Sequence, residues 1–251
     1  MKLTEQPDRY GRLKEEKMNQ KINLKTICPV FLSDADEFAS ELETIEQSTA
    51  DMIEMRLDEY YRDHGLQGLL DRLSTLKPED FGKEVIWTLR SAPQGGKADI
   101  SREDYARVIE AANRLPGLTD VELDQAASLG DNYQPERTVM SWHDFESTPN
   151  SQELSGLWDE MESYKPKIEK ISVMPKTPKD VQNLLQSCKN HQTEQEKIAI
   201  SMGEMGKISR ILADFFGSGY TFASAITSSA PGQPSLEELT FYRSAIAYPY
   251  H

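Results

Sequence analysis

The stretch KISVMP, residues 170–175, reads as a buried β-strand, and the fold can be worked out from it. In an extended chain, successive side chains point to opposite faces. Lys170 therefore shares a face with Ser172 and Met174, while Ile171 and Val173 form the other, apolar face. Ammonium groups are almost never fully buried without partners, so a lysine in this setting is ordinarily a surface residue. The rest of the chain decides between the two readings.

Segments with strand character alternate with amphipathic segments along the chain. The predicted strands are residues 24–30, 51–58, 84–91, 118–124, 137–145, 166–175, 196–203 and 219–225. The predicted helices are residues 33–47, 66–76, a segment from 101, then 151–163, 178–190, 206–215 and 236–247. Only thirteen residues lie between Leu123 and Arg137. The fourth helix must therefore be short or replaced by a turn or two.

Eight strands that alternate with helices predict a parallel sheet. Over about 250 residues the economical closure of such a sheet is a (β/α)₈ TIM barrel. We therefore expect an α/β fold with one barrel domain at residues 21–251 and an abbreviated fourth helix. Residues 1–20 are expected to be a polar N-terminal extension.

Composition restricts the classes of partner. The net charge of −14 argues against a nucleic-acid binder or a protein of anionic membrane surfaces. No apolar run approaches the ~20 residues that cross a membrane, and the first residues lack the apolar core of a signal peptide. Cys28 and Cys188 stand in no metal-binding spacing, which favours free thiols in a reducing compartment. We expect a cytoplasmic protein whose partner is a small molecule; a homodimer is compatible with the sequence.

Charged residues alternate along the other strands in a way that directs them to the barrel interior. Period-two alternation turns Glu54, Arg56, Arg90, His143 and the set Asp120, Glu122 and Asp124 inward. Barrel interiors are normally filled by apolar layers, and active sites lie at the carboxyl ends of the strands. Taken singly, Arg56 could form a surface ion pair and His143 could be a loop histidine. Five strands that aim ionisable groups at one interior are poorly explained by chance.

These groups suggest covalent chemistry at Lys170. Desolvation and nearby cations, such as Arg56 and Arg90, favour the neutral, nucleophilic form of a lysine amine. We therefore infer a lysine that forms a Schiff base, with His143 as its acid and base partner.

Three turns complete the pattern. The segment GKISR, residues 206–210, looks like a helix start whose backbone N–H groups face an anion, with Arg210 one turn in. The segment SSAPGQ, residues 228–233, follows the eighth strand, where barrels often bind anionic groups, although its proline and glycine alone predict only a tight turn. The segment QGG, residues 94–96, reads as a flexible loop that would suit a lid.

Together these motifs resemble the type I 3-dehydroquinate dehydratases of the shikimate pathway. The matching segments are EMRLD (54–58), TLRS with QGG (88–96), SWHDF (141–145), KISVMP (170–175), GKISR (206–210) and FASA through SAPGQ (222–233). They follow the order of the family and cover about residues 24–245. Several motifs in order are far more specific than any one of them.

The resemblance implies a lyase that removes water from 3-dehydroquinate to give 3-dehydroshikimate, without a metal or nucleotide cofactor. Lys170 would form the Schiff base and His143 would act as general acid and base. The resemblance also implies the binding residues. Arg210, Ser229 and Gln233 would hold the substrate carboxylate, Glu54, Arg56 and Arg90 would bind the ring hydroxyls, and Phe145, Met202 and Phe222 would form an apolar wall. From its inward position on the strand, we assign Glu122 to orienting Arg90 or the lysine.

The sequence departs from the family pattern at three places. Gln94 stands where family members often have a glutamate near the catalytic histidine, and an amide cannot tune a histidine pKa by charge. This departure bears on the pH optimum more than on activity. Pro29 replaces an expected small hydroxyl residue on the first strand, and the charged extension does not resemble the hairpin that closes the barrel floor in some relatives.

Two other functions remain open at this point. A class I aldolase would also use a barrel lysine, but it gives no reason for the predicted carboxylate site at Arg210, Ser229 and Gln233. A non-catalytic barrel that binds an acidic metabolite would use the arginines, but it has no need of Lys170 and His143 together.

Overall fold

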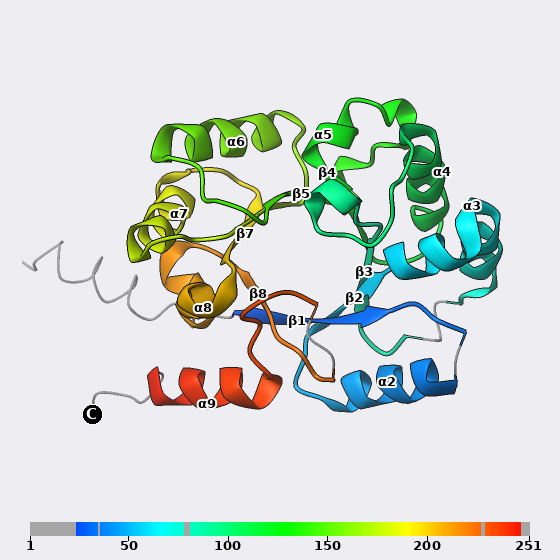
Figure 1. Cartoon of the computed structure of the whole chain (residues 1–251), viewed down its shortest axis with the longest axis horizontal. Helices are drawn as coiled ribbons and strands as arrows, with labels where there is room; N and C mark the ends of the chain where they lie inside the picture. The colour runs from blue at the N-terminus through cyan, green and yellow to red at the C-terminus, as the bar shows by residue number, and fades with distance from the viewer. Residues whose placement is uncertain (1–23, 35, 78–80, 227–228, 247–251) are drawn as a thin grey trace, which may run out of the picture.

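Eight parallel strands form the inner layer of the computed structural model, which describes residues 24–34, 36–77, 81–226 and 229–246 (Figure 1). The predicted extension, residues 1–20, lies outside this range. The strands follow the order β7-β6-β5-β4-β3-β2-β1-β8. Their bounds are β1 Lys25–Phe31, β2 Met52–Arg56, β3 Glu84–Thr88, β4 Leu118–Glu122, β5 Thr138–Asp144, β6 Ile168–Val173, β7 Glu196–Ser201 and β8 Tyr220–Phe222. The predicted TIM barrel is thereby confirmed.

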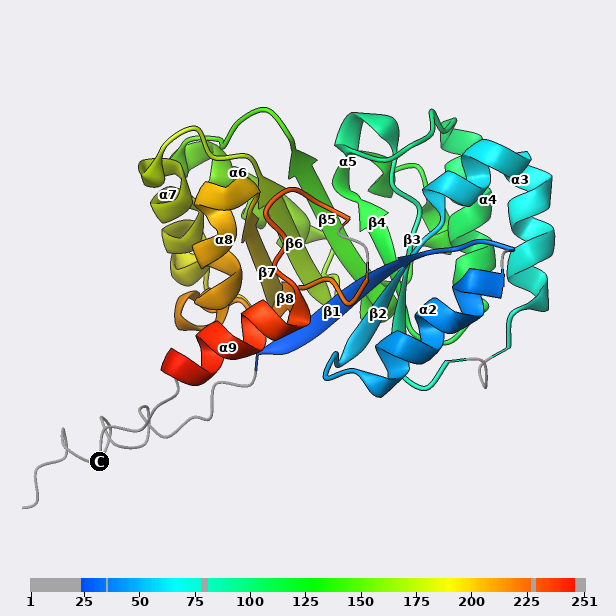
Figure 2. The same cartoon turned by 60° about the horizontal axis from the view of Figure 1, so that its bottom comes forward.

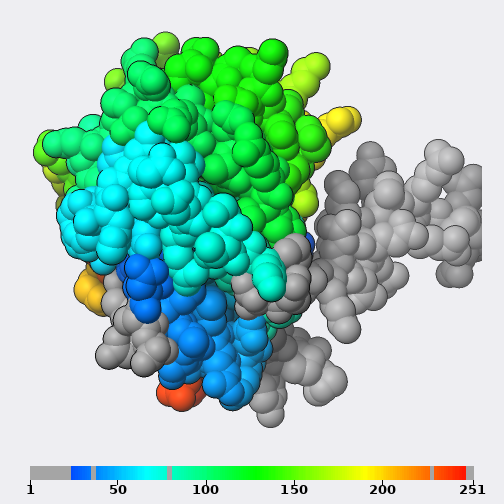
Figure 3. Space-filling model, turned by 90° about the vertical axis from the view of Figure 1, so that its right-hand side faces the viewer, coloured from blue at the N-terminus to red at the C-terminus, as the bar shows by residue number. Residues whose placement is uncertain are grey.

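Helices surround the strands and form the outer layer (Figures 1 and 2). Their bounds are α2 Asp36–Gln47, α3 Asp58–Thr75, α4 Arg102–Ala112, α5 Leu123–Ala126, α6 Ser151–Ser163, α7 Pro178–Asn190, α8 Gly203–Ile211 and α9 Leu236–Ile246. From the side, α3 lies between α2 and the segment around α4 and forms a continuous surface with them (Figure 3). None of the helices in the described ranges combines the length and the apolar character that a membrane span requires.

The helix that follows β4 is abbreviated, as the sequence predicts. The helix α5 has four residues, and two 3₁₀ turns, Gly130–Asn132 and Pro135–Arg137, complete the connection to β5. Asp124 lies in α5 and is exposed. The prediction that Asp124 points into the barrel is therefore wrong, because β4 ends at Glu122 and the strand alternation ends with it.

Two helices begin earlier than predicted. The helix α3 starts at Asp58 instead of residue 66, and a kink at Gly65 (φ 67°) interrupts the periodicity that would have revealed its first half. The helix α8 starts at Gly203 instead of residue 206. Gly206 lies within α8, where a Cβ atom would come within 2.2 Å of the Ser201 carbonyl oxygen. Because residue 206 is a glycine, α8 can pack closely against the end of β7. Residue 206 therefore lies within the helix, and the prediction of an anion-binding helix start at this residue is wrong.

The interior of the barrel is built in two levels. An apolar layer fills its lower part and includes Ile27, Met52, Ile86, Leu118, Val139, Ile168, Ile198 and Tyr220. On five consecutive strands, β2 to β6, the next inward residue is polar and buried: Glu54, Thr88, Asp120, Ser141 and Lys170. On β7 and β8 the next inward residues are Ile200 and Phe222, which stay apolar. The polar level thus lies on one side of the barrel, directly above a water-excluding floor.

The barrel is least regular where β8 meets its neighbours. β8 pairs with β1 over three residues, from Lys25↔Tyr220 to Ile27↔Phe222. The described residues show no ladder between β7 and β8. There Gly219 N donates to the Lys197 carbonyl at 2.9 Å, and Ala199 N donates to Ser218 Oγ at 3.2 Å. The junction of β8 with its neighbours β1 and β7 is called the seam below.

Candidate active site

Lys170 is buried inside the barrel and paired with two carboxylates. Only 4% of the residue is exposed, and its Nζ lies 3.3 Å from Glu54 Oε1 and 3.4 Å from Asp120 Oδ2. The same nitrogen lies 4.5 Å from the centre of the Phe222 ring. The alternative interpretation of Lys170 as a surface residue is therefore excluded. The cations predicted to surround it are present in the cavity, but its nearest charged partners are acidic.

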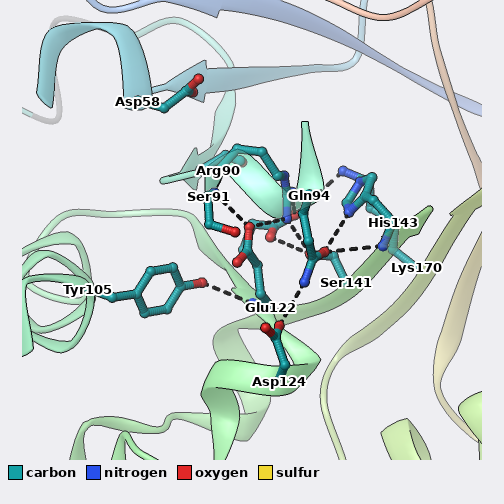
Figure 4. Close-up of polar contacts among 12 residues, drawn as sticks. Asp58, Arg90, Ser91, Gln94, Tyr105, Glu122, Asp124, Ser141, His143 and Lys170 are labelled. Carbon is teal, nitrogen blue, oxygen red and sulfur yellow. Dashed lines mark hydrogen bonds and ion pairs between the residues drawn. The ribbon is translucent and has the colours of Figure 1, made fainter. Parts of the chain in front are cut away.

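Arg90 ties three strands together beside the lysine (Figure 4). Its Nη2 lies 2.8 Å from Asp120 Oδ2, and its Nη1 donates to Glu122 Oε1 at 3.2 Å and to Ser141 Oγ at 2.8 Å. Ser141 Oγ in turn donates to Asp120 Oδ1 at 2.6 Å. Glu122 thus contacts Arg90, one of the two roles expected of it. Asp120 and Ser141 were not predicted as site residues, although strand alternation had turned Asp120 inward and Ser141 is the first residue of the SWHDF motif.

Burial and charge act in opposite directions on the pKa values of this network. Burial alone would raise the pKa of Asp120, but Arg90 and Lys170 reverse the effect and lower it below the ordinary value. For Glu122, burial outweighs the attraction of Arg90 and raises the pKa. Asp120 is therefore the carboxylate of this network that most favours the ionised form, and both Arg90 and Lys170 contact it.

Arg56 is held in place by Asp58, a residue the sequence did not single out. The guanidinium forms a two-point contact, with Nε 2.8 Å from Asp58 Oδ1 and Nη2 3.0 Å from Oδ2. Asp58 is fully buried and also accepts a hydrogen bond from the Lys97 backbone N–H at 3.0 Å. Such a fork fixes the plane of the guanidinium. Asp58 is part of the EMRLD motif, which was the available signal for it.

Gln94 connects His143 to the helix α5 (Figure 4). Its Nε2 donates to Asp124 Oδ1 at 2.7 Å, and its Oε1 accepts from the His143 backbone N–H at 3.1 Å. A carboxylate only accepts and a backbone N–H only donates, so these two contacts assign the amide oxygen and nitrogen. The same Oε1 lies 3.1 Å from His143 Nδ1. Nδ1 must therefore carry the proton, and the lone pair of the neutral ring is left on Nε2.

Burial lowers the pKa of His143 well below its ordinary value, and the cations Arg90, Lys170 and Arg56 lower it further. The ring is therefore neutral near pH 7 and available as a base at Nε2.

The QGG turn is packed, whereas the sequence predicted a flexible loop. Gln94 is 5% exposed, and Gly95 has a φ of 85°. A Cβ atom on Gly95 would come within 2.2 Å of the Phe145 ring, and one on Gly96 within 1.8 Å of the Arg90 carbonyl oxygen. Both glycines are needed for this close approach, which holds the Gln94 side chain against His143.

Arg210 is a buried cation on the opposite side of the cavity. It lies in the last turn of α8 and is 2% exposed. Within the described ranges no carboxylate forms an ion pair with it, and its Nε has no hydrogen-bond partner there. Burial accordingly lowers its pKa to about 10, with only Glu54 acting in the other direction. A buried guanidinium in this state is poised to bind an anion.

Ser229 and Gln233 lie on the turn after β8 and line the same cavity as Arg210. The N–H and the hydroxyl of Ser229 both donate to Gln233 Oε1, at 2.9 and 3.1 Å. Gly232 has a φ of 69°, and its Cα approaches Gly203 so closely that a Cβ atom would lie 2.1 Å from the Gly203 carbonyl oxygen. The turn is thereby fixed to the start of α8.

One cavity brings these groups together. It is lined by Glu54, Arg56, Arg90, Gln94, His143, Phe145, Lys170, Met202, Arg210, Phe222, Ser229 and Gln233, with Gly95, Ser172, Ile200 and Ala230 between them. Every predicted site residue except Glu122, which lies behind Arg90, is in this lining. Pro29 is not, and it supplies no hydroxyl group to the site.

Comparisons with known proteins agree with this arrangement. The family model of type I 3-dehydroquinase matches residues 26–247. The 3-dehydroquinate dehydratase of Streptococcus mutans is 35% identical over 226 residues, which cover 86% of this chain and 96% of that relative. That of Streptococcus thermophilus is 33% identical over 235 residues, which cover 89% of this chain and 99% of the relative.

Solved structures give the same result. The crystal structure of type I 3-dehydroquinate dehydratase from Clostridium difficile with covalently modified comenic acid has a TM-score of 0.78 at 28% identity, and covers 89% of this chain and 92% of that one. The 3-dehydroquinate dehydratase from Geobacillus kaustophilus has a TM-score of 0.76 at 26% identity, over 91% and 93% of the two chains. This chain belongs to the type I 3-dehydroquinase family.

Proposed function

We propose that this chain converts 3-dehydroquinate to 3-dehydroshikimate through a Schiff base on Lys170. The observation that carries the proposal is the pairing of a buried lysine with a histidine whose Nε2 is unprotonated, in one cavity that also holds an uncompensated arginine. Lys170 is the only lysine in that lining. A nucleophilic amine, a base and a carboxylate site together match a keto acid as substrate.

The chemistry divides into four steps. The Lys170 ammonium group gives up one proton, its Nζ adds to the C3 ketone, and the former ketone oxygen takes up that proton together with one from the nitrogen and leaves as water, which gives an iminium ion. His143 Nε2 removes a proton from C2, whose electrons pass into the iminium system. The C1 hydroxyl then departs with the proton that His143 now carries, so a water molecule is released and a C1–C2 double bond forms. Hydrolysis of the imine consumes one water molecule and restores Lys170. The net change is loss of one water from the substrate.

The acidic neighbours of Lys170 take part in the first step. The ammonium group must lose a proton before it can attack, and Glu54 and Asp120 are both within ion-pairing distance of Nζ. Once the iminium ion has formed, the same carboxylates stabilise its positive charge. Arg56, aligned by Asp58, and Arg90, aligned by Asp120 and Glu122, are the proposed ligands of the ring hydroxyls.

Borohydride trapping tests the proposal directly. Sodium borohydride reduces an imine to a stable secondary amine, so incubation with 3-dehydroquinate should add one reduced adduct per chain, which tryptic mass spectrometry should place on Lys170. Without borohydride, the ultraviolet absorbance of a conjugated product should rise. Folded protein that binds the compound yet gives neither adduct nor product would favour the non-catalytic alternative. Cleavage of a carbon–carbon bond would favour the aldolase.

Substitution of Arg210 by methionine is expected to weaken substrate binding more than turnover. The KM should rise about 10- to 100-fold, because a hydrogen bond to a charged group contributes about 1.5–3 kcal/mol. The thermal stability of the free protein should not fall, since the substitution removes a buried cation for which the described residues provide no counterion. Steady-state kinetics and a melting curve check both results. An unchanged KM would place the carboxylate elsewhere, and Arg210→Lys, which keeps the charge, is the matched control.

Substitution of Gln94 by glutamate is expected to move the pH profile. A carboxylate beside Nδ1 stabilises the imidazolium form and so raises the pKa of His143. A base is active when unprotonated, so the acidic limb of kcat/KM should shift to higher pH. The control is Gln94→Glu with Asp124→Asn, which removes the repulsion between the new carboxylate and Asp124. If the acidic limb of the pH profile does not move in either variant, that limb does not reflect the titration of His143.

The proposal includes a cytoplasmic location and a single catalytic domain over residues 21–251. Cys28 and Cys188 are buried free thiols, which suits a reducing compartment. A homodimer is compatible with this proposal, and sedimentation velocity would give the state of assembly.

A further inference from the structure

A second group of ionisable side chains lies outside the barrel, between α6 and α7, which are neighbouring helices (Figure 1). Asp159 and Glu162 are one turn apart on α6, and His191 follows the last residue of α7. One ligand atom from each of the three lies within 4.8 Å of the others. The proposed lyase chemistry uses none of these residues.

Behind His191 is Glu169, a carboxylate that the barrel buries completely. Glu169 is on β6 next to Lys170, but on the face that points away from the cavity, and it is 0% exposed. Its Oε2 lies 3.1 Å from His191 Nε2, and its Oε1 has no hydrogen-bond partner among the described residues. A buried carboxylate that is only half satisfied is costly unless a positive charge is close by.

The contact with Glu169 bears on which His191 nitrogen is free. When Glu169 is ionised it accepts from Nε2, and in the neutral ring the lone pair is then on Nδ1. Nδ1 faces Asp159 Oδ1 at 3.7 Å. In this tautomer the two facing atoms are both acceptors, with no hydrogen between them. Trp158 stacks on the imidazole, with ring centres 5.7 Å apart, and holds this orientation.

The nearby ammonium group of Lys197 donates its hydrogen bonds to backbone carbonyl oxygens. Asp159 and Glu162 each place a carboxylate oxygen within 4.8 Å of a His191 ring nitrogen, and Glu169 contacts Nε2 of the same ring, so three carboxyl groups surround one imidazole. Lys197 is the nearby cation, but its Nζ donates to the carbonyl oxygens of Cys188 and His191, at 2.7 and 2.6 Å. The cluster therefore concentrates acceptors around one point on the outer surface.

We propose that Asp159, Glu162 and His191 bind a Zn²⁺ ion, with Glu169 as the carboxylate that orients His191. One imidazole nitrogen and two carboxylate oxygens are a donor set that zinc accepts, with a water molecule in the fourth position. Bond lengths of about 2.0–2.2 Å place tetrahedral ligand atoms roughly 3.4 Å apart, close to the observed separation of Nδ1 and Asp159 Oδ1. The chain of carboxylate, histidine and metal is the usual way in which proteins fix a metal-binding imidazole.

Such an ion would connect α6 to the end of α7 directly outside the strand that carries Lys170. A ligand that binds only the folded state stabilises it by mass action. Zinc at this site should therefore raise the melting temperature of the protein.

The test is calorimetric titration of the full chain with ZnCl₂ after removal of metals by chelation, combined with melting curves. The double variant Asp159→Asn with Glu162→Gln should abolish saturable binding and the zinc-dependent rise in melting temperature. The single variant Glu169→Gln should weaken binding roughly tenfold or more, as expected for loss of an orienting carboxylate. The matched control is Glu160→Gln, which removes one charge from an exposed position of the same helix and should bind zinc as the parent does.

Co²⁺ provides a structural readout that does not depend on stability. Tetrahedral Co²⁺ has visible absorption bands that change when an imidazole ligand is lost, so His191→Gln should alter the spectrum of the cobalt-loaded protein. Zinc binding that survives the double variant, or that the Glu160→Gln control weakens equally, would overturn the proposal. So would a chelated parent protein that shows neither saturable binding nor a zinc-dependent rise in melting temperature.

Discussion

Substitution of Lys170 by alanine is expected to reduce turnover to an undetectable level and to eliminate the borohydride-trapped adduct. The amine is the group that forms the covalent bond to the substrate, and no other lysine of the described residues lines the cavity. Steady-state assays and intact-protein mass spectrometry measure the two losses. A variant that kept a turnover close to that of the parent would disprove the covalent mechanism, whatever its effect on binding.

The same substitution also has a structural cost that must be separated from the chemical one. It leaves Glu54 and Asp120 without the Lys170 cation, and removal of one partner of a buried ion pair costs about 3–5 kcal/mol. Lys170→Arg is the matched control. A guanidinium keeps the positive charge but is not a nucleophile that forms imines. Inactive but stable Lys170→Arg protein would assign the loss to chemistry.

Substitution of His143 by alanine should slow turnover by about 10²–10⁴-fold, the usual contribution of a general acid–base group, and still permit imine formation. Because the amine of Lys170 remains, substrate should accumulate as a Schiff base that borohydride can trap. The measurement is the ratio of trapped adduct to product over time, which should rise relative to the parent. No adduct at all would mean that His143 acts before or during imine formation.

His143→Asn is the control for this experiment. An asparagine amide can place a donor near the position of Nδ1 and keep the contact with Gln94 Oε1, but it has no basic nitrogen in place of Nε2. If the asparagine variant is as slow as the alanine variant, the loss is due to the missing base. If it retains activity, His143 acts by positioning other groups.

Strand periodicity predicted most of this fold because buried strands leave a strong signal. Inward and outward residues alternate without exception through the five polar strands, so Glu54, Lys170 and His143 could be assigned to one interior before any pairing was known. Positions where an element begins or ends were harder. The periodicity of α3 is broken at Gly65, and Asp124 continues the alternation of β4 although the chain has already turned into α5.

The electrostatic partners could not be predicted in the same way, because they come from different strands. The contact of Arg90 with Asp120 and that of Lys170 with Glu54 depend on strand register and shear, which a linear pattern does not contain. For this reason the sequence suggested that cations surround Lys170, whereas the structure adds carboxylates. Asp120 and Ser141 were missed for the same reason, whereas Asp58, two residues after Arg56, could have been found from the EMRLD motif.

Because of the seam, we expect the barrel to open locally more readily at β8 than at the strands with continuous ladders. Pairing β8 with β1 joins segments from opposite ends of the chain, and such distant contacts are slow to form. We expect amide protons of β8 to exchange with solvent faster than those of β5 and β6, which are paired over six residues. Phe222 and the turn with Gln233 are next to the seam, while His143 and Lys170 are on the continuous ladder. We therefore expect local opening on the side where Arg210 and Gln233 are proposed to bind the substrate carboxylate, while His143 and Lys170 keep their geometry.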